Sequence, residues 1–386
     1  MNSAMENPAV RQSLGLVDCT KPLCDDLQKK IETLYTDEEI RNFCEVLLTG
    51  CGDSYVAGLA VQPAFEALSG MRVKALSTTE LCFHYPLPSG DYGPALAVGV
   101  SISGKAADTA AAMQAVKNAG GWTLGVTESR TTALAQTADR ILKHDSMEAE
   151  LAPGTKTYFT SLLSLLLLAI HFGVARGHIT ADEAAAVRAD IEGYTEAFRP
   201  VIPTLTEQCM ALAEMLKDCR HFETVGSGTD YATAAFVREK IYEAVGKVTA
   251  VENTEDWLHV NYYARKPEEI GTLLFAAGDS PAKSRYLEAA WAMDFIGRPY
   301  VVVTDLDAGE FPPSAKVITL PKAPRLWLTP LMQFMPMTML FGFMQELLGE
   351  KPLRGLEGVW GGKNAIYADQ SGILDYFKEK GDGRRV

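Results

Sequence analysis

Two short segments decide the fold of this chain: GCGDSY at residues 50–55 and GSGTDY at residues 226–231. Each follows a short apolar run and precedes a helical pattern, and the second lies 176 positions after the first. A further pair of turns, SISG at 101–104 and FAAG at 275–278, repeats with a nearly equal offset of 174. This regular offset indicates two copies of one strand–turn–helix unit.

Short apolar runs alternate with amphipathic ones around these turns, which predicts right-handed βαβ units and parallel sheets. The expected strands are Glu45–Thr49, Arg72–Leu76, Ala95–Ser101, Trp122–Val126, Arg140–His144, Phe222–Val225, Val248–Val251, Thr272–Ala276, Tyr300–Thr304 and Lys316–Leu320. The expected helices are Tyr55–Leu68, Ala106–Asn118, Thr132–Ala138, Tyr231–Val245 and Ser284–Phe295. We therefore predict a helical arm (1–40), an α/β domain (41–180), a helical connector (181–216), a second α/β domain (217–350) and a tail (351–386).

The composition is that of an acidic globular protein. The 386 residues are 47% hydrophobic and carry a formal net charge of −13, which makes nucleic acid an unfavourable partner. The seven cysteines form no C-x-x-C pair, and residues 1–27 contain no apolar core of a signal peptide. We therefore expect a cytoplasmic protein with reduced thiols and no metal site.

Two segments are apolar enough to be considered as membrane spans, Tyr158–Ala175 and Leu326–Leu348. Each follows a run of strand-like segments and so lies at the same place in its copy. This parallel favours buried helices over membrane spans.

The SISG turn offers hydroxyl groups at the carboxyl end of an apolar strand. Ser101, Ser103 and the free amides of a following helix could bind an anion such as phosphate, helped by the helix dipole. The alternative is that Ser103 simply caps the next helix. The FAAG turn of the second copy lacks the hydroxyls, so only the first copy could hold an anion through side chains.

The glycines of the first turns carry a weaker signal. A dinucleotide fingerprint needs a third glycine where this chain has Tyr55 and Tyr231, so a dinucleotide site is disfavoured. The structural alternative is that the glycines permit sharp strand-to-helix turns and that Ser54 is the N-cap of the following helix.

Three residues of the second copy are candidates for acid–base chemistry. Lys240 and Glu243 are three positions apart and share one helix face, although a solvated ion pair is the simpler interpretation. His259 lies in ENTEDWLHVNYY, where neighbouring aromatic side chains are expected to shield it in part and acidic ones to tune it.

Together these motifs resemble the SIS (sugar isomerase) domain family in tandem: GCGDSYVAG, SISGKAADT, the Thr155–Lys156 pair, and K-x-x-E followed 16 positions later by histidine. The resemblance covers roughly residues 41–349. It is strongest to the isomerase domain of glucosamine-6-phosphate synthase and to fructosamine-6-phosphate deglycases.

The resemblance implies two three-layer αβα domains, each with a parallel, flavodoxin-like sheet. It implies that Glu243 is the catalytic base, that Lys240 orients it, and that His259 acts from a neighbouring subunit. The residues it assigns to phosphate or sugar binding are Gly52, Ser54, Ser101, Ser103, Gly104, Lys105 and Thr155. It further implies a sugar phosphate substrate, no cofactor, no membrane, and a homodimer or dimer of dimers with shared active sites.

The chain departs from the family pattern where substrate would be gripped. The family commonly has S-Q-S-G-E-T at this turn, whereas Ile102, Lys105 and Ala106 stand here. Asp256 replaces the family's glutamate before the histidine, and Lys363 is displaced from the position of the synthase's ring-opening lysine.

We expect either an aldose–ketose isomerase or a deglycase that acts on an amine-linked sugar 6-phosphate. No glutaminase segment precedes the first α/β unit, which argues against the synthase reaction. Lys105 slightly favours an amine-bearing substrate with its own carboxylate. The alternative class is a sugar-phosphate sensor without catalytic activity.

Overall fold

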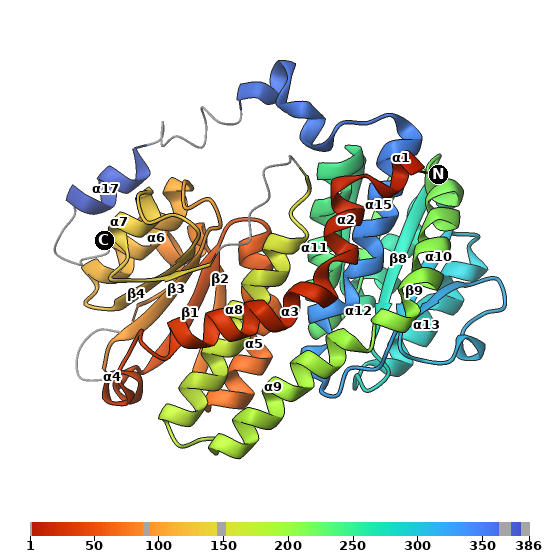
Figure 1. The fold of residues 1–386 in the computed structure, drawn as a ribbon. Coiled ribbons are helices and arrows are strands. Elements are labelled where there is room, and N and C mark those ends of the chain that lie inside the picture. The colour runs from red at the N-terminus through yellow and green to blue at the C-terminus, as the bar shows by residue number, and fades with distance from the viewer. Residues whose placement is uncertain (1, 88–92, 145–151, 363–371, 380–386) are drawn as a thin grey trace. The chain divides into compact units, whose positions relative to one another are not determined.

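The computed structural model describes residues 2–87, 93–144, 152–362 and 372–379 (Figure 1). The chain forms two compact units. The unit that we call the first α/β unit comprises Thr20–Glu148, Lys156–Ala189 and Leu356–Val386. The second α/β unit comprises Met1–Cys19, Ala149–Thr155 and Asp190–Gly355.

The first α/β unit contains a parallel sheet with strand order β2-β1-β3-β4-β5. Its strands are β1 (Glu45–Gly50), β2 (Arg72–Ser77), β3 (Ala95–Val100), β4 (Trp122–Thr127) and β5 (Arg140–Lys143). Every residue of β1 and β3 is buried, as expected for central strands that are covered on both faces. The covering helices are α5 (Asp53–Ser69) and α8 (Lys156–Ala175), which pack on each other, and α6 (Ala107–Asn118) with α7 (Ala133–Thr137).

The second α/β unit repeats this architecture, with a parallel sheet of order β10-β9-β8-β6-β7. Its strands are β6 (His221–Val225), β7 (Val248–Glu252), β8 (Ile270–Ala276), β9 (Tyr300–Thr304) and β10 (Lys316–Thr319). Its main helices are α11 (Thr229–Val245), α12 (Thr254–His259), α13 (Lys283–Phe295) and α15 (Met335–Leu348). Helix α11 begins and ends 176 positions after α5, so the predicted doubling of a parallel α/β unit is confirmed. The predicted strands and helices lie within two residues of the observed ones.

The two strongly apolar segments are helical, as predicted. Each is long and apolar enough to cross a membrane by length and composition alone, but 89% of its apolar window is buried inside the structure. The second segment is broken into η6 (Leu326–Leu328), α14 (Pro330–Gln333) and α15. Burial of this extent is typical of core helices.

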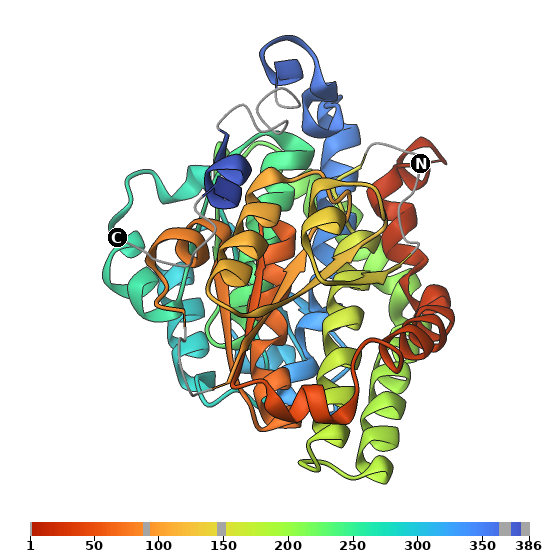
Figure 2. The ribbon, with the colours of Figure 1, turned by 90° about the vertical axis from the view of Figure 1, so that its left-hand side faces the viewer.

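The remaining helices flank the two sheets. They are α1 (Asn2–Met5), α2 (Pro8–Leu14), α3 (Leu16–Ile31), α4 (Asp37–Asn42), α9 (Ala181–Glu196) and α10 (Ile202–Leu216). Helix α10, in the segment expected to be a connector, packs its apolar face on α15. Helix α2 also packs on α15, where Ser13 Oγ lies 2.7 Å from Thr338 Oγ1. Figure 2 shows how the chain reverses its direction between α8 and α9.

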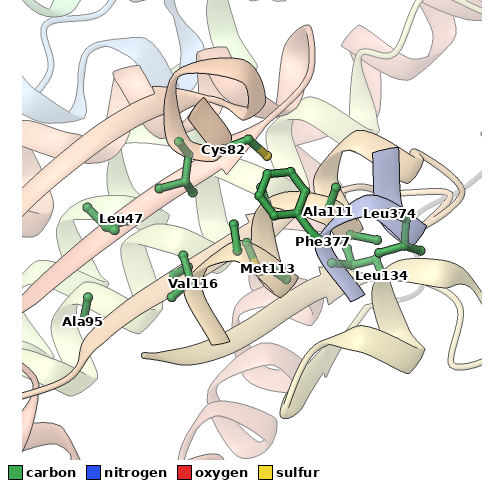
Figure 3. Packing of buried hydrophobic residues seen from close by; sticks show 14 residues of the cluster. Leu47, Cys82, Ala95, Ala111, Met113, Val116, Leu134, Leu374 and Phe377 are labelled. Atoms are coloured by element: carbon green, nitrogen blue, oxygen red, sulfur yellow. The ribbon is translucent and has the colours of Figure 1, made fainter. Parts of the chain in front are cut away.

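Short elements complete the described chain. They are η1 (Glu80–His84), η2 (Arg199–Val201), η3 (Asn261–Tyr263), η4 (Pro267–Glu269), η5 (Ala308–Glu310), η7 (Pro352–Leu356), η8 (Gly358–Gly362) and α17 (Ile373–Glu379). Helix α17 packs on α6, where Leu374 and Phe377 join a buried cluster with Met113 and Leu134 (Figure 3). The Asn118 amide donates a hydrogen bond to the Phe377 carbonyl at 2.6 Å.

Candidate functional site

The SISG turn leaves β3 at the carboxyl edge of the first sheet. The Ser101 amide donates to the Val126 carbonyl of β4 (3.0 Å), and the Gly104 amide donates to the Ser101 carbonyl (2.9 Å). Gly104 has a φ of 65°, and a Cβ at this position would overlap the Thr132 hydroxyl. The turn therefore requires glycine because of both its backbone conformation and its close neighbours.

The serines of this turn do not cap the next helix. The N-cap of α6 is Ala106, which makes no side-chain capping hydrogen bond, so the expectation that Ser103 caps α6 is wrong. The Ser103 hydroxyl instead accepts a weak bond from the Lys105 amide at 3.4 Å. Ser103 and Lys105 are both exposed, and the first amides of α6 have no side-chain cap. This combination of an exposed hydroxyl, a lysine and an uncapped helix start can bind an anion.

The corresponding turn of the second copy is filled by its own carboxyl groups. The Ala277 amide donates to Asp230 Oδ2 (3.1 Å), and the Gly278 amide donates to Asp305 Oδ1 (2.5 Å). The repeat offset places Ser54 opposite Asp230. Thr127 and Thr304 make the same hydrogen bond in the two copies, to the carbonyls of Ile102 and Ala276, so Glu128 stands opposite Asp305. The amides of the second turn are therefore satisfied by side-chain carboxyl groups, whereas the Gly104 amide of the first turn bonds a backbone carbonyl.

Asp230 is completely buried within its own hydrogen-bond network. Its carboxyl group accepts from the Tyr286 hydroxyl and from Gln333 Nε2, each at 2.7 Å. Burial raises the pKa of Asp230 above its usual value. The sequence carries one signal for this role: the alignment of GCGDSY with GSGTDY places aspartate opposite Ser54.

The first turns of both copies have the same backbone shape. Gly52 (φ 54°, ψ −130°) and Gly228 (φ 60°, ψ −127°) are the N-caps of α5 and α11. The expectation that Ser54 caps α5 is therefore wrong, because Ser54 lies inside the first helical turn. These conformations are accessible to glycine and costly for other residues, which supports the structural role assigned to the glycines.

Thr155 immediately precedes α8 and is fully buried. Its hydroxyl donates to the Pro153 carbonyl at 3.3 Å.

Lys240 and Glu243 form an ion pair near the end of α11. Lys240 Nζ lies 2.6 Å from Glu243 Oε2 and 4.9 Å from the centre of the Phe236 ring. The Lys240 side chain is 1% exposed and the Glu243 side chain 28%. The simpler interpretation of a solvated ion pair is therefore wrong: a buried ammonium group holds a carboxylate that still reaches the surface.

His259 is the last residue of α12 and is 71% exposed. Its Nε2 lies 2.9 Å from Glu255 Oε1, and Arg285 contacts the same carboxylate at 2.8 Å. The expected shielding by neighbouring aromatic residues is wrong, because Trp257 points into the core and Tyr263 is itself exposed.

A buried ion pair anchors the segment that carries His259. Glu223 Oε2 accepts from Trp257 Nε1 (2.7 Å) and from Arg298 Nη1 (3.0 Å). Arg298 also donates to the Asn261 carbonyl at 2.7 Å. These bonds fix the residues on both sides of His259, while its ring remains open to the surface.

The candidate residues fall into two groups. Gly52, Ser54, Ser101, Ser103, Gly104 and Lys105 lie in the first α/β unit; Thr155, Lys240, Glu243 and His259 lie in the second. Lys363 lies outside the described residues.

The fold defines a tandem α/β protein in which the first copy alone carries the hydroxyls of the SISG turn. Residues 39–171, which span most of the first sheet and its helices, match the family model of the SIS domain.

Proteins of known name or structure resemble longer parts of the chain. It is 27% identical over 240 residues to the isomerizing glutamine–fructose-6-phosphate aminotransferase of Clostridium acetobutylicum, an alignment that covers 62% of this chain and 37% of that protein. The chain spans about a third of the length of the curated relatives it matches.

Solved structures share the fold of nearly the whole chain. The C-terminal domain of glucosamine-fructose-6-phosphate aminotransferase from Francisella tularensis has a TM-score of 0.75 at 15% identity and covers 88% of this chain and 97% of its own. The tagatose-6-phosphate ketose/aldose isomerase of Escherichia coli has a TM-score of 0.62 at 16% identity, with 90% and 92% covered.

Proposed function

We propose that this chain is a cofactor-independent enzyme that transfers a proton between C1 and C2 of a sugar 6-phosphate. The observation that carries the proposal is the buried Lys240 ammonium group, 2.6 Å from a carboxylate that remains partly exposed. A buried ammonium group is costly unless it is paired, so the structure holds Glu243 in one place. The substrate class is supported by two similar proteins, a glutamine–fructose-6-phosphate aminotransferase and a tagatose-6-phosphate ketose/aldose isomerase.

The phosphate is proposed to bind at the SISG turn. Ser101 and Ser103 supply hydroxyl donors, and the Lys105 amide and the start of α6 supply further donors. The Gly104 amide, which the sequence also suggested as a donor, is already bonded to the Ser101 carbonyl. Gly52, Ser54 and Thr155 are proposed to contribute to phosphate or sugar binding. The amides of the second turn already donate hydrogen bonds to carboxyl oxygens. We therefore propose that each chain binds one phosphate, at the first turn.

The proton transfer is proposed to proceed through an enediol or an enolamine. Glu243 removes the proton from one carbon as the carbonyl oxygen, or the imine nitrogen, gains a proton. It then returns the proton to the neighbouring carbon. Lys240 orients Glu243 and stabilises negative charge that develops beside it. His259 assists ring opening or proton delivery at the sugar oxygen, from a neighbouring subunit.

Two reactions fit this chemistry. An aldose–ketose isomerase would release the isomeric sugar phosphate. A deglycase would use the same proton transfer on an amine-linked sugar 6-phosphate, and water would then release the amine and a hexose phosphate. Lys105 is exposed at the turn and could meet a substrate carboxylate, which favours the deglycase slightly.

A substrate screen tests the proposal. Hexose 6-phosphates and their amino-acid adducts are incubated with the protein in heavy water, and deuterium at C1 and C2 is followed together with product release. Isomer formation identifies an isomerase, and amine release identifies a deglycase. Equal activity of Lys105→Ala on substrates with and without a carboxylate would contradict the role of Lys105.

The same screen separates the enzyme from a sugar-phosphate sensor. A sensor would be stabilised against heat by a sugar phosphate without exchange or product. We further propose a cytoplasmic homodimer or dimer of dimers, which the mass in solution would test.

A further inference from the structure

The chain makes a strained turn just beyond α15. Within η7, Leu353, Arg354 and Gly355 have φ values of 52°, 56° and 66°. Left-handed backbone is unfavourable for residues that carry a Cβ, and here two of them follow one another. Such a conformation persists only where surrounding contacts hold it, and it is often found at functional sites.

Arg354 makes the contacts that hold this turn. Its Nη2 donates to the Ala244 carbonyl at 2.7 Å and lies 3.4 Å from the Glu243 carbonyl. The same atom donates to the Lys351 carbonyl at 3.1 Å, and Nε lies 3.2 Å from the Glu350 carboxylate. The guanidinium group thus joins the turn after α15 to the last turn of α11.

The end of α11 is shaped to receive this guanidinium group. Gly246 closes the helix with a left-handed φ of 66°. A Cβ at position 246 would overlap the Arg354 guanidinium group, so glycine gives the arginine its access. The last carbonyls of a helix carry partial negative charge, which an arginine both neutralises and hydrogen-bonds.

This contact acts on the peptide group of Glu243 itself. Lys240 holds the Glu243 carboxylate, whereas Arg354 bonds the main chain from which that side chain projects. A shift of the last helical turn would move the carboxylate even if the pair with Lys240 survived.

We propose that Arg354 is a positioning residue for Glu243, and that η7 is a strained clamp that fixes the end of α11. The assignment rests on the proposed role of Glu243 as the base. Arg354 acts through the main chain of α11.

Three variants test the assignment: Arg354→Ala, Arg354→Lys, and Arg354→Ala combined with Glu243→Gln. Displacement of a reacting group by about 1 Å can cost about a hundredfold in rate, so we expect Arg354→Ala to lower kcat by about 10–100-fold, with KM within about threefold. Lysine keeps the charge but lacks the planar, rigid guanidinium fork, so it should give an intermediate kcat. Added methylguanidinium should restore part of the kcat of Arg354→Ala.

The double variant separates positioning from a structural effect. If Arg354 acts through Glu243, the double variant should exchange substrate protons no more slowly than Glu243→Gln alone. Arg199→Ala is the matched control, because Arg199 forms ion pairs with Glu196 and Asp18 at the surface; its kcat should stay at the wild-type value. Thermal melting of each variant reports whether it is folded. If Arg354→Ala is not folded, the kcat of Arg354→Lys is used for the test in its place.

Wild-type kcat in Arg354→Ala, or in Arg354→Lys if only that variant folds, would overturn the inference. So would a double variant about tenfold slower than Glu243→Gln, because independent effects multiply. Loss of activity in Glu243→Gln together with full activity in Arg354→Ala would overturn the clamp alone. Full activity of Glu243→Gln would instead overturn the proposed function, and the clamp with it.

Discussion

At the scale of single residues, the ion pair of Lys240 and Glu243 joins a buried ammonium group to a carboxylate that solvent can reach. The lysine is 1% exposed and the glutamate 28%, so one partner is fixed by the core while the other can meet a ligand. The sequence predicted the pair and its shared helix face from the spacing of three. It could not predict the burial of Lys240, because Phe236 and the residues that cover the ammonium group are set by tertiary packing.

The burial of Lys240 predicts how much each substitution at the ion pair lowers the free energy of unfolding. Glu243→Ala leaves the buried ammonium group without its carboxylate and should destabilise the protein by about 3 kcal/mol, whereas Glu243→Gln keeps an oxygen acceptor and should cost less. Adding Lys240→Met to Glu243→Ala should recover much of the loss, because no charge then remains buried. Urea unfolding measures all of these values. A double variant less stable than Glu243→Ala alone would contradict this account of the pair.

The hydroxyls of the SISG turn predict a loss of phosphate affinity. A hydrogen bond to a charged group contributes about 1.5–3 kcal/mol, so Ser101→Ala and Ser103→Ala should each raise the Kd for fructose 6-phosphate by about tenfold or more. Isothermal titration calorimetry measures the change. Ser280→Ala, in the turn region of the second copy, is the matched control and should bind normally. Equal affinity in all three variants would place the phosphate elsewhere.

At the scale of elements, most of the architecture could be predicted from the sequence, because the same order of apolar runs and glycine turns occurs in both copies. Apolar runs located the ten strands to within two residues, and the constant offset related α5 to α11. The caps were predicted less well: Ser54 and Ser103 are favoured cap residues, yet Gly52 and Ala106 occupy the caps. A cap depends on where the first helical turn begins, and a shift of two residues in that start changes the cap.

The sequence also could not predict that carboxyl groups satisfy the backbone amides at the turn of the second copy. Whether backbone amides are free or satisfied depends on side chains from distant segments, here Asp230 and Asp305. Only the alignment of the two copies gave a signal, by placing aspartate opposite Ser54.

Asp230 predicts a pH dependence of stability. Burial raises its native pKa above the usual 3.8, so the native state keeps a proton that the unfolded chain has already released. Its contribution to stability is therefore complete below pH 3.8 and is lost as the pH rises through the native pKa. Asp230→Asn cannot titrate, so this fall in stability should be absent from its urea unfolding curves between about pH 4 and 8.

The control for this measurement is Asp279→Asn. Asp279 is an exposed residue paired with Lys322, and its loss should leave the fall in stability in place. A pH profile that is identical for the wild type and Asp230→Asn would show that Asp230 does not titrate in this range.

At the scale of the whole molecule, two copies of one α/β unit carry different side chains at equivalent positions. The first copy keeps hydroxyls at its SISG turn and a helix start without a side-chain cap, whereas the second fills its turn with carboxyl groups and carries a buried lysine–glutamate pair on α11. The position of that pair in α5 is taken by Ala64 and Ala67, so neither charge is repeated. The copies therefore divide anion binding and proton transfer between them in the proposed mechanism.

This division predicts that binding and chemistry can be separated by mutation. Ser103→Ala should raise the KM for the sugar phosphate with a smaller effect on kcat, while Glu243→Gln should lower kcat with nearly unchanged affinity. Steady-state kinetics on the substrate found in the screen give both constants. Parallel losses of kcat and affinity in both variants would contradict a division of roles.

Deuterium exchange at C1 and C2 in heavy water tests the central claim most directly. General base catalysis contributes about 10²–10⁴-fold, so Glu243→Gln should exchange the substrate proton at least about a hundredfold more slowly than the wild type. It should still bind the sugar phosphate within a few-fold of the wild-type affinity. Exchange by Glu243→Gln at nearly the wild-type rate would show that Glu243 is not the base.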